Sequence, residues 1–130
     1  MRRLWTHRNI GAAAPVVWQV FCDLERWPQW GPSVRSAQLN GPTLSLGATG
    51  TVTTDVGVDL GFTITEFEDG AVWAWRVAGL PATAHSVGSL GAGRCRAGFG
   101  VPFVAAPYLA ICRVALRRID ALATGAQIDR

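Results

Sequence analysis

The stretch APVVWQVFCDLERWPQW, residues 14–30, joins a helical pattern to a bend rich in tryptophan. Pro15 suits the first turn of a helix, where its missing N–H costs no hydrogen bond. Apolar residues then repeat at helical spacing as far as Leu24, and they predict a helix over residues 15–25. Because a proline disfavours helix in the residue before it, residues 27–32 are predicted to form a short aromatic elbow that cannot continue this helix.

Residues 33–101 consist of short apolar-rich runs separated by turn residues, with no helical pattern between them. Asp69-Gly70 lies between two alternating runs and is a strong hairpin signal. Residues 2–10 form a shorter run that predicts an edge strand. This order of elements favours an antiparallel meander.

The later strands of the meander alternate between apolar and charged side chains. One face of the sheet is therefore predicted to be buried and the other solvated. On the apolar face lie Trp73, Trp75, Val77, Cys95, Ala97 and Phe99, and on the other lie Arg76, Arg94 and Arg96.

The cover for the apolar face is predicted near the C-terminus. Apolar residues from Ala105 to Ala123 step by three and four, with Arg113 and Arg117 on the opposite side. This pattern predicts an amphipathic helix of about 20 residues, about 30 Å long, that ends at Gly125. A sheet of this many strands twists and curls, and a straight helix lying across it cannot fill its concave side. The sequence therefore predicts a cavity between the sheet and the helix.

The composition fits one domain with one core. The chain has 130 residues, of which 49% are hydrophobic and 16% charged, and this favours a packed globule. The formal charge is +3, but no basic stripe or nucleic-acid-binding motif is present. Cys22, Cys95 and Cys112 are odd in number and form no CxxC, which favours a reducing compartment. Without a signal-peptide pattern or a long apolar run, the protein is expected to be cytoplasmic, with no stable membrane insertion.

Residues 14–30 resemble the opening of the polyketide cyclase/dehydrase branch of the START-like (SRPBCC) superfamily. The resemblance covers about residues 5–125 and implies an α+β helix-grip fold. In that fold a curved antiparallel β-sheet of about seven strands wraps around a long C-terminal α-helix, with a short N-terminal helix pair. It also implies that residues 1–130 form a single START-like ligand-binding domain with a deep cavity. Further matches are Leu46-Gly47, Thr65-Glu66-Phe67-Glu68, Trp75-Arg76-Val77, His85 and the terminal Arg117-Arg118-Ile119-Asp120-Ala121-Leu122.

Two polar side chains are the candidate catalytic residues. A neutral His85 in the cavity could bond to a ligand carbonyl or shuttle a proton; alternatively, it anchors a hairpin to a backbone carbonyl. Tyr108 either binds a ligand oxygen at the cavity mouth or packs with its hydroxyl in water. If Phe62 and Ile64 point inward, Glu66 shares their phase and could lie in the cavity with a raised pKa; alternatively, it is solvated at a strand end. The residues expected to line the cavity are Trp27, Trp30, Phe62, Ile64, Trp73, Trp75, His85, Val87, Phe99, Tyr108, Leu109 and Cys112.

Two functions stay open from the sequence. The first is binding or carriage of a hydrophobic small molecule, such as a lipid, a quinone or a polyketide-like aromatic, because the predicted lining is mostly apolar. The second is a polyketide aromatase/cyclase of dehydratase type that uses a polar residue of the same cavity. No Cys/His cluster has metal-ligand spacing, so no metal and no cofactor are expected. No nucleic-acid partner is expected either, and a homodimer is left open.

Overall fold

The structure, a computed structural model that describes residues 2–125, has its helical segments at the two ends of the chain and its strands mostly between them. The strands form one antiparallel sheet in which neighbours in sequence are neighbours in space, except that the first strand pairs with the last. In chain order the elements are β1 (Leu4–Ile10), α1 (Ala14–Cys22), η1 (Leu24–Arg26), α2 (Trp27–Trp30), β2 (Val34–Leu39), β3 (Thr49–Thr54), β4 (Asp59–Glu68), β5 (Val72–Val77), β6 (Leu80–Gly91), β7 (Arg94–Val101), η2 (Phe103–Tyr108) and α3 (Leu109–Thr124).

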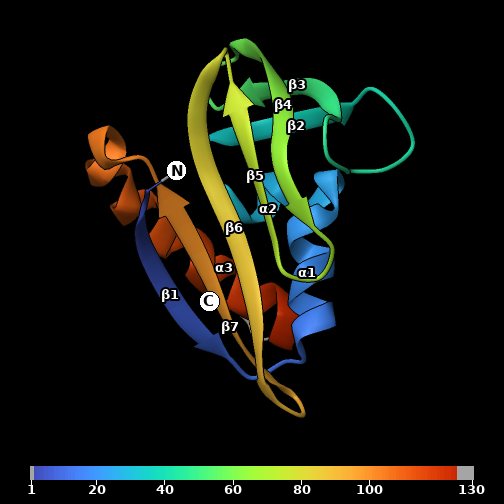
Figure 1. Ribbon diagram of the computed structural model, residues 1–130, viewed down its shortest axis with the longest axis vertical. Helices are drawn as coiled ribbons and strands as arrows, with labels where there is room; N and C mark the ends of the chain where they lie inside the picture. Colours follow the sequence, from blue (N-terminus) through green and yellow to red (C-terminus); the bar gives the residue numbers. More distant parts are fainter. Residues whose placement is uncertain (1, 126–130) are drawn as a thin grey trace.

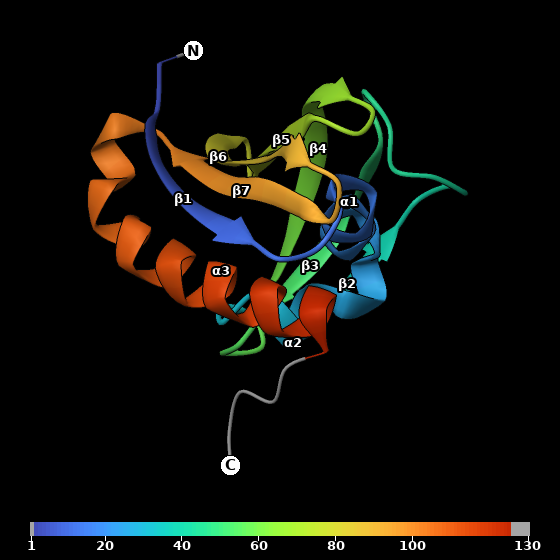
Figure 2. The same ribbon diagram turned by 90° about the horizontal axis from the view of Figure 1, so that it is seen from below.

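The long helix α3 lies along the curled sheet, and the short helices close one side (Figures 1 and 2). α3 packs on β1 and β7 and also on α1 and α2. Its buried face consists of small and aliphatic residues, among them Cys112, Ala115, Leu116 and Ile119. This arrangement of a seven-stranded antiparallel sheet around a C-terminal helix confirms the predicted helix-grip fold.

The N-terminal helical region differs from the prediction in two ways. α1 ends at Cys22 rather than near residue 25, because Asp23 has extended backbone and its carboxylate accepts a hydrogen bond from the Glu25 N–H (3.0 Å), which begins η1. The predicted elbow is itself a helical turn, α2. Pro28 lies in the first turn of α2, the position where a missing N–H breaks no helical bond.

The C-terminal helix also starts later than predicted. Residues 103–108 form the 3₁₀ segment η2, which contains Pro107, and Ala105 within it has non-helical backbone. Because Ala105 has non-helical backbone and a proline disfavours helix in the residue before it, the regular α-helix begins after Pro107, and α3 starts at Leu109. The predicted end is confirmed, since Gly125 follows α3 in the left-handed conformation (φ 72°).

Bulges in β4 and β5 change which face each later residue occupies. The pairing of the two strands shifts between Ile64 and Glu66, so the expectation that Glu66 shares the inward phase of Ile64 is wrong. Glu66 instead ends a cross-strand row that begins at Gly100. Its carboxylate accepts a hydrogen bond from Arg3, which holds the pKa of Glu66 below its usual range. Between Gly100 and Glu66 the row consists of Ala84 and Ala74. Their small side chains leave room for the Arg3 side chain, which is only 10% exposed.

Gly50 allows β3 to pass close to the Phe62 ring. A Cβ at this position would collide with the Gln38 carbonyl oxygen and would lie 2.5 Å from the Phe62 ring. We therefore expect Gly50→Ala to lower the free energy of unfolding by about 2 kcal/mol. Gly88, in the exposed part of β6, has no atom within 4 Å of such a Cβ. Gly88→Ala is the matched control and should change stability by less than about 0.5 kcal/mol. Equal urea midpoints for the two variants would contradict this account.

Candidate functional site

A pocket of about 310 Å³, here called the outer pocket, opens at one end of the sheet. At this end β3, β5 and β7 finish, β4 and β6 begin, and η2 crosses toward α3. Its walls are almost entirely apolar, and no Asp, Glu, Lys or Arg is among the described residues that line it. The lining consists of Ser33, Val34, Val52, Thr54, Leu60, Trp75, Val77, Pro81, Ala82, Thr83, Val101, Pro102, Ala105 and Tyr108.

A second, much smaller hollow lies deeper, between the aromatic side chains and α3. This inner pocket has a volume of about 40 Å³, room for about one water molecule. Both pockets are lined by Ser33, Val34, Trp75, Thr83 and Tyr108, so these five residues form the neck between them. The deep part of the predicted cavity is thus largely filled by the protein's own side chains.

The filling is an aromatic cluster. The Trp27 indole stacks on Trp73 at 5.3 Å, and Trp73 stacks on the His85 imidazole at 3.8 Å. Phe21 and Phe99 add edge-on contacts around His85 and Trp30. Such offset and edge-to-face arrangements favour aromatic pairs beyond the area that they bury.

Two indole hydrogen bonds hold the cluster in place. Trp27 Nε1–H donates to the Phe21 carbonyl (2.9 Å), and Trp30 Nε1–H donates to the Val20 carbonyl (3.1 Å). Both acceptors belong to the last turn of α1, where carbonyls have no partner within the helix. The tryptophans of α2 therefore supply hydrogen-bond donors to two carbonyls at the end of α1, and these bonds fix the orientation of both indole rings.

His85 is completely enclosed in this cluster, and both of its nitrogens are hydrogen-bonded. Nδ1 lies 3.2 Å from the Trp73 carbonyl oxygen, which can only accept, so the proton resides on Nδ1. Nε2 therefore accepts from the Thr83 hydroxyl at 2.9 Å, and that hydroxyl accepts from Trp75 Nε1–H at 3.0 Å. Burial lowers the pKa of His85 to about 3. The imidazole is neutral near pH 7, and its one lone pair is already engaged.

The opening of the neck carries a pair of hydroxyls. Ser33 Oγ and Tyr108 Oη are 2.6 Å apart, and burial raises the pKa of the Tyr108 phenol, which keeps it neutral. When one of the two hydroxyls donates to the other, the second hydroxyl keeps its own proton for a further partner. This pair can therefore donate one hydrogen bond to a ligand. The nearby Cys112 thiol is no nucleophile at neutral pH, because burial raises its pKa to about 12.

The residues that were expected to line the cavity fall into two groups, those packed in the core and those that line the inner pocket. Phe62, Ile64, Trp73 and Val87 are buried in the core and, like Leu109, line neither pocket. The inner pocket is lined by Trp27, Trp30, Trp75, His85, Phe99, Tyr108 and Cys112.

Of the residues expected to line the cavity, only Trp75 and Tyr108 belong to the walls of the outer pocket, and the sequence reasoning missed the rest of these walls. They come from residues next to turns, such as Thr54, Leu60, Val77 and Ala82. The only sequence signal for them is that each lies in an apolar run beside a break at Gly57 or at Gly79-Leu80-Pro81.

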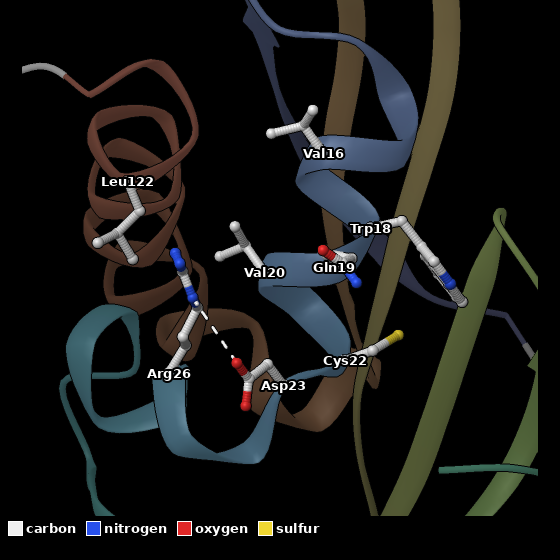
Figure 3. A pocket seen from close by; sticks show the side chains of 8 residues that line it. All are labelled: Val16, Trp18, Gln19, Val20, Cys22, Asp23, Arg26 and Leu122. Atoms are coloured by element: carbon white, nitrogen blue, oxygen red, sulfur yellow. Dashed lines mark ion pairs between the residues drawn. The ribbon is translucent and has the colours of Figure 1, made fainter. Parts of the chain in front are cut away.

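A larger hollow of about 520 Å³ lies outside this region, between α1, η1 and the end of α3. Figure 3 shows that its lining side chains do not converge: Val20 is directed toward Leu122, whereas Trp18 and Cys22 lie on the other side of α1. Asp23 and Arg26 at its edge pair with each other at 3.7 Å. This hollow is lined in part by polar and charged side chains, among them Gln19, Asp23 and Arg26, whereas the walls of the outer pocket are almost entirely apolar, as is typical of small-molecule sites. The outer pocket is therefore the better candidate for the site.

Two further features were sought within residues 2–125. No group of three His, Cys, Asp or Glu side chains there is placed to hold a metal ion. In the same range no helix has the length and apolar character needed to cross a membrane.

Residues 1–106 match the family described as "Polyketide cyclase / dehydrase and lipid transport". That segment includes the sheet, α1, α2 and most of η2. No curated protein matches the chain.

Solved structures with the same fold have low sequence identity. The protein XoxI of Bacillus cereus is 14% identical, with a TM-score of 0.73 over 99% of this chain and 100% of XoxI. The di-domain ARO/CYC protein BexL of the BE-7585A biosynthetic pathway is 12% identical, with a TM-score of 0.71 over 95% of this chain and 47% of BexL. Norcoclaurine synthase of Thalictrum flavum, solved with dopamine and hydroxybenzaldehyde, is 11% identical, with a TM-score of 0.64 over 98% and 89%. These likenesses establish the fold.

The depressed pKa of His85 predicts a specific dependence of stability on pH. Since the folded pKa is about 3 and the unfolded value about 6.5, the unfolded state binds more protons between these values. Stability is therefore lost as the pH falls below about 6.5. From about pH 7 to pH 5, wild type should lose about 2 kcal/mol more than His85→Gln, measured by urea unfolding.

His7 is the other histidine and is exposed, so His7→Gln removes an imidazole without changing the surroundings of His85 and is the matched control. If His85→Gln and His7→Gln lost the same free energy between the two pH values, His85 would not be held neutral by burial.

Proposed function

The chain belongs to the polyketide cyclase/dehydrase and lipid transport family, and from this premise we propose that it binds one apolar small molecule in the outer pocket. The polar atom of the ligand lies at the neck, where it accepts a hydrogen bond from the Ser33–Tyr108 pair. The observation that carries the proposal is an open, apolar pocket with one available hydroxyl donor at its inner end.

The size of the pocket limits the ligand. Small-molecule pockets span roughly 300–1,000 Å³, and the outer pocket, at about 310 Å³, lies at the lower limit. The inner pocket adds only about 40 Å³. A compact aromatic or a short acyl chain with one carbonyl fits this space, whereas a complete two-chain phospholipid does not.

The chemistry of the lining favours binding over proton transfer. No ionised side chain lines the pocket within residues 2–125, and His85 has both nitrogens committed to Trp73 and Thr83. General base catalysis needs a group that can take a proton from the substrate at the working pH. Neither His85 nor Cys112 meets that condition.

The second candidate function is that of an aromatase/cyclase, and the hydroxyl pair is the observation that favours it. A neutral phenol beside a second hydroxyl can donate to a ketone and stabilise the negative charge of an enolate. BexL, described as an ARO/CYC protein, shares the fold. In this case Tyr108 is the residue that touches the substrate.

Filling the outer pocket tests the first proposal. Ala105 lines the pocket from η2, so Ala105→Trp places an indole where the ligand is expected. Titration with the neutral fluorophore N-phenyl-1-naphthylamine should show a Kd at least about tenfold higher for this variant than for wild type. Ala92→Trp, in the exposed β6–β7 turn, is the matched control and should bind like wild type.

Native mass spectrometry of freshly purified protein, followed by solvent extraction, identifies any ligand that is retained. If wild type bound no apolar fluorophore and carried no extractable ligand, the proposed function would be wrong.

The hydroxyl pair predicts a preference for ligands that carry a carbonyl. Removing one hydrogen-bond donor costs about 1 kcal/mol, or about fivefold in affinity. Tyr108→Phe should therefore weaken binding of the ketone fluorophore 6-propionyl-2-dimethylaminonaphthalene by about fivefold and leave N-phenyl-1-naphthylamine unchanged.

An equal loss for both fluorophores would show that Tyr108 contributes only shape. Cyclisation of a poly-β-ketone by wild type that Tyr108→Phe abolishes would favour the aromatase/cyclase instead.

A further inference from the structure

Exposed apolar side chains gather around the mouth of the outer pocket. Of the eleven large apolar side chains that are exposed within residues 2–125, eight belong to segments that meet at this end of the sheet, which are the start of β1, the β3–β4 turn, the start of β6 and η2. The most prominent lie on three separate tips: the β3–β4 turn, the β5–β6 turn and η2. These residues, here called the rim, are Val56, Val58, Leu80, Phe103 and Val104, with exposed fractions from 50% to 95%.

The topology explains why the three tips share one end. In an antiparallel meander, alternate turns lie at the same end of the sheet, so the β3–β4 and β5–β6 turns are neighbours of the end of β7. β7 leads directly into η2, and the start of β1 pairs with the end of β7. Figure 1 shows the β5–β6 turn, η2 and the N-terminal end of β1 toward the upper part of the molecule.

An arginine accompanies each apolar tip. Arg35 donates to the Asp55 carbonyl in the β3–β4 turn (3.0 Å), and Arg76 donates to the Gly79 carbonyl in the β5–β6 turn (3.3 Å). The Arg2 guanidinium lies 5.9 Å from the centre of the Phe103 ring. None of the three forms an ion pair with a carboxylate of the described residues.

The carboxylates at this end are Asp55 and Asp59, and Asp59 accepts a hydrogen bond from Thr53. The rim therefore combines protruding apolar side chains with a local excess of positive charge, three arginines against two carboxylates.

We propose that the rim docks the protein on an anionic lipid bilayer, with the mouth of the outer pocket facing the membrane. Apolar tips insert into the interface between headgroups and acyl chains, while arginines at their bases contact lipid phosphates. This pairing of apolar tips with adjacent cations fits a bilayer because both signals are needed for stable attachment of a peripheral protein.

A second copy of the chain fits the rim less well. Two identical rims would bring their unpaired arginines together, and like charges at an interface are unfavourable. The apolar residues also stand on three separate tips rather than on one flat face, so two copies would bury little area between them. A bilayer, in contrast, deforms around protruding side chains and is itself a store of apolar molecules.

The purpose of the docking rests on the proposed function, since the mouth would face the phase from which an apolar ligand enters. The docking itself does not need a ligand. Binding to vesicles and binding of N-phenyl-1-naphthylamine are separate measurements, so either can fail while the other holds.

The test is flotation of the full chain with vesicles of phosphatidylcholine alone or mixed with phosphatidylglycerol. Wild type should float with the mixed vesicles and bind neutral vesicles at least about tenfold more weakly. Leu80→Ser, on the rim, should weaken binding at least about fivefold, and so should Arg76→Glu. Val104→Ser is a further rim variant, and it cannot disturb the core because Val104 is 95% exposed.

Matched controls are available at the opposite end of the sheet. Leu46 in the β2–β3 loop is 66% exposed, against 68% for Leu80, and Arg94 at the start of β7 is exposed as Arg76 is. Leu46→Ser and Arg94→Glu should bind vesicles like wild type. The proposal is overturned if wild type does not float with anionic vesicles, or if the control variants lose as much affinity as the rim variants. A concentration-dependent dimer that the rim variants dissociate, without vesicle binding, would identify a second copy as the occupant.

Discussion

The hydrogen bonds that join the Trp27 and Trp30 indoles to the last carbonyls of α1 determine how much of this fold is hollow. They fix two large rings over the concave face of the sheet, where Trp27 stacks on Trp73 and Trp73 stacks on His85. A sheet curled around a straight helix leaves space between the two, and here that space is occupied by side chains whose polar atoms are mostly paired. The open volume that remains lies at the mouth, where the strands end and no tryptophan of α2 reaches.

Because the open volume lies at the mouth and not in the interior, it also determines which side chains a ligand can contact. His85 serves the interior: it links β6 to the Trp73 carbonyl of β5 and completes the hydrogen bonding of Thr83 and Trp75. Because both nitrogens are hydrogen-bonded in this way, the structure favours the anchoring role, which was one of the two interpretations of His85 from sequence. The groups that can meet a ligand are instead the hydroxyls of Ser33 and Tyr108, which the chain brings together across 75 positions.

The sequence was sufficient to predict the architecture because the spacing of apolar residues along a strand or helix follows directly from which face is buried. The alternation around Trp73 and Cys95 predicted the buried face, and the three-and-four spacing after Ala105 predicted the covering helix. Two local features escaped it. The bulge after Ile64 carries no glycine or proline to mark it, and it turned Glu66 to the outer face. Pro107 was visible, but the apolar spacing continued across it, so the helix was extended over a segment that is η2. Apart from Trp75 and Tyr108, the walls of the outer pocket could not be predicted, because the boundary between filled and open space depends on side-chain packing between strands distant in sequence.

The break at Pro107 has a consequence for how the pocket can open. η2 contains Pro107, which has no N–H to donate, and Ala105, whose backbone is non-helical, so regular α-helical structure begins only at Leu109. The same short segment supplies one wall of the pocket through Ala105 and Tyr108 and part of the rim through Phe103 and Val104. Within the described residues, its side-chain hydrogen bond across the mouth is the one between Tyr108 and Ser33. A single hydrogen bond contributes on the order of 1 kcal/mol, so the proposed contact between the rim and a bilayer would act directly on this wall of the pocket. Docking and ligand exchange would therefore be coupled through η2, while the aromatic cluster behind it stays fixed.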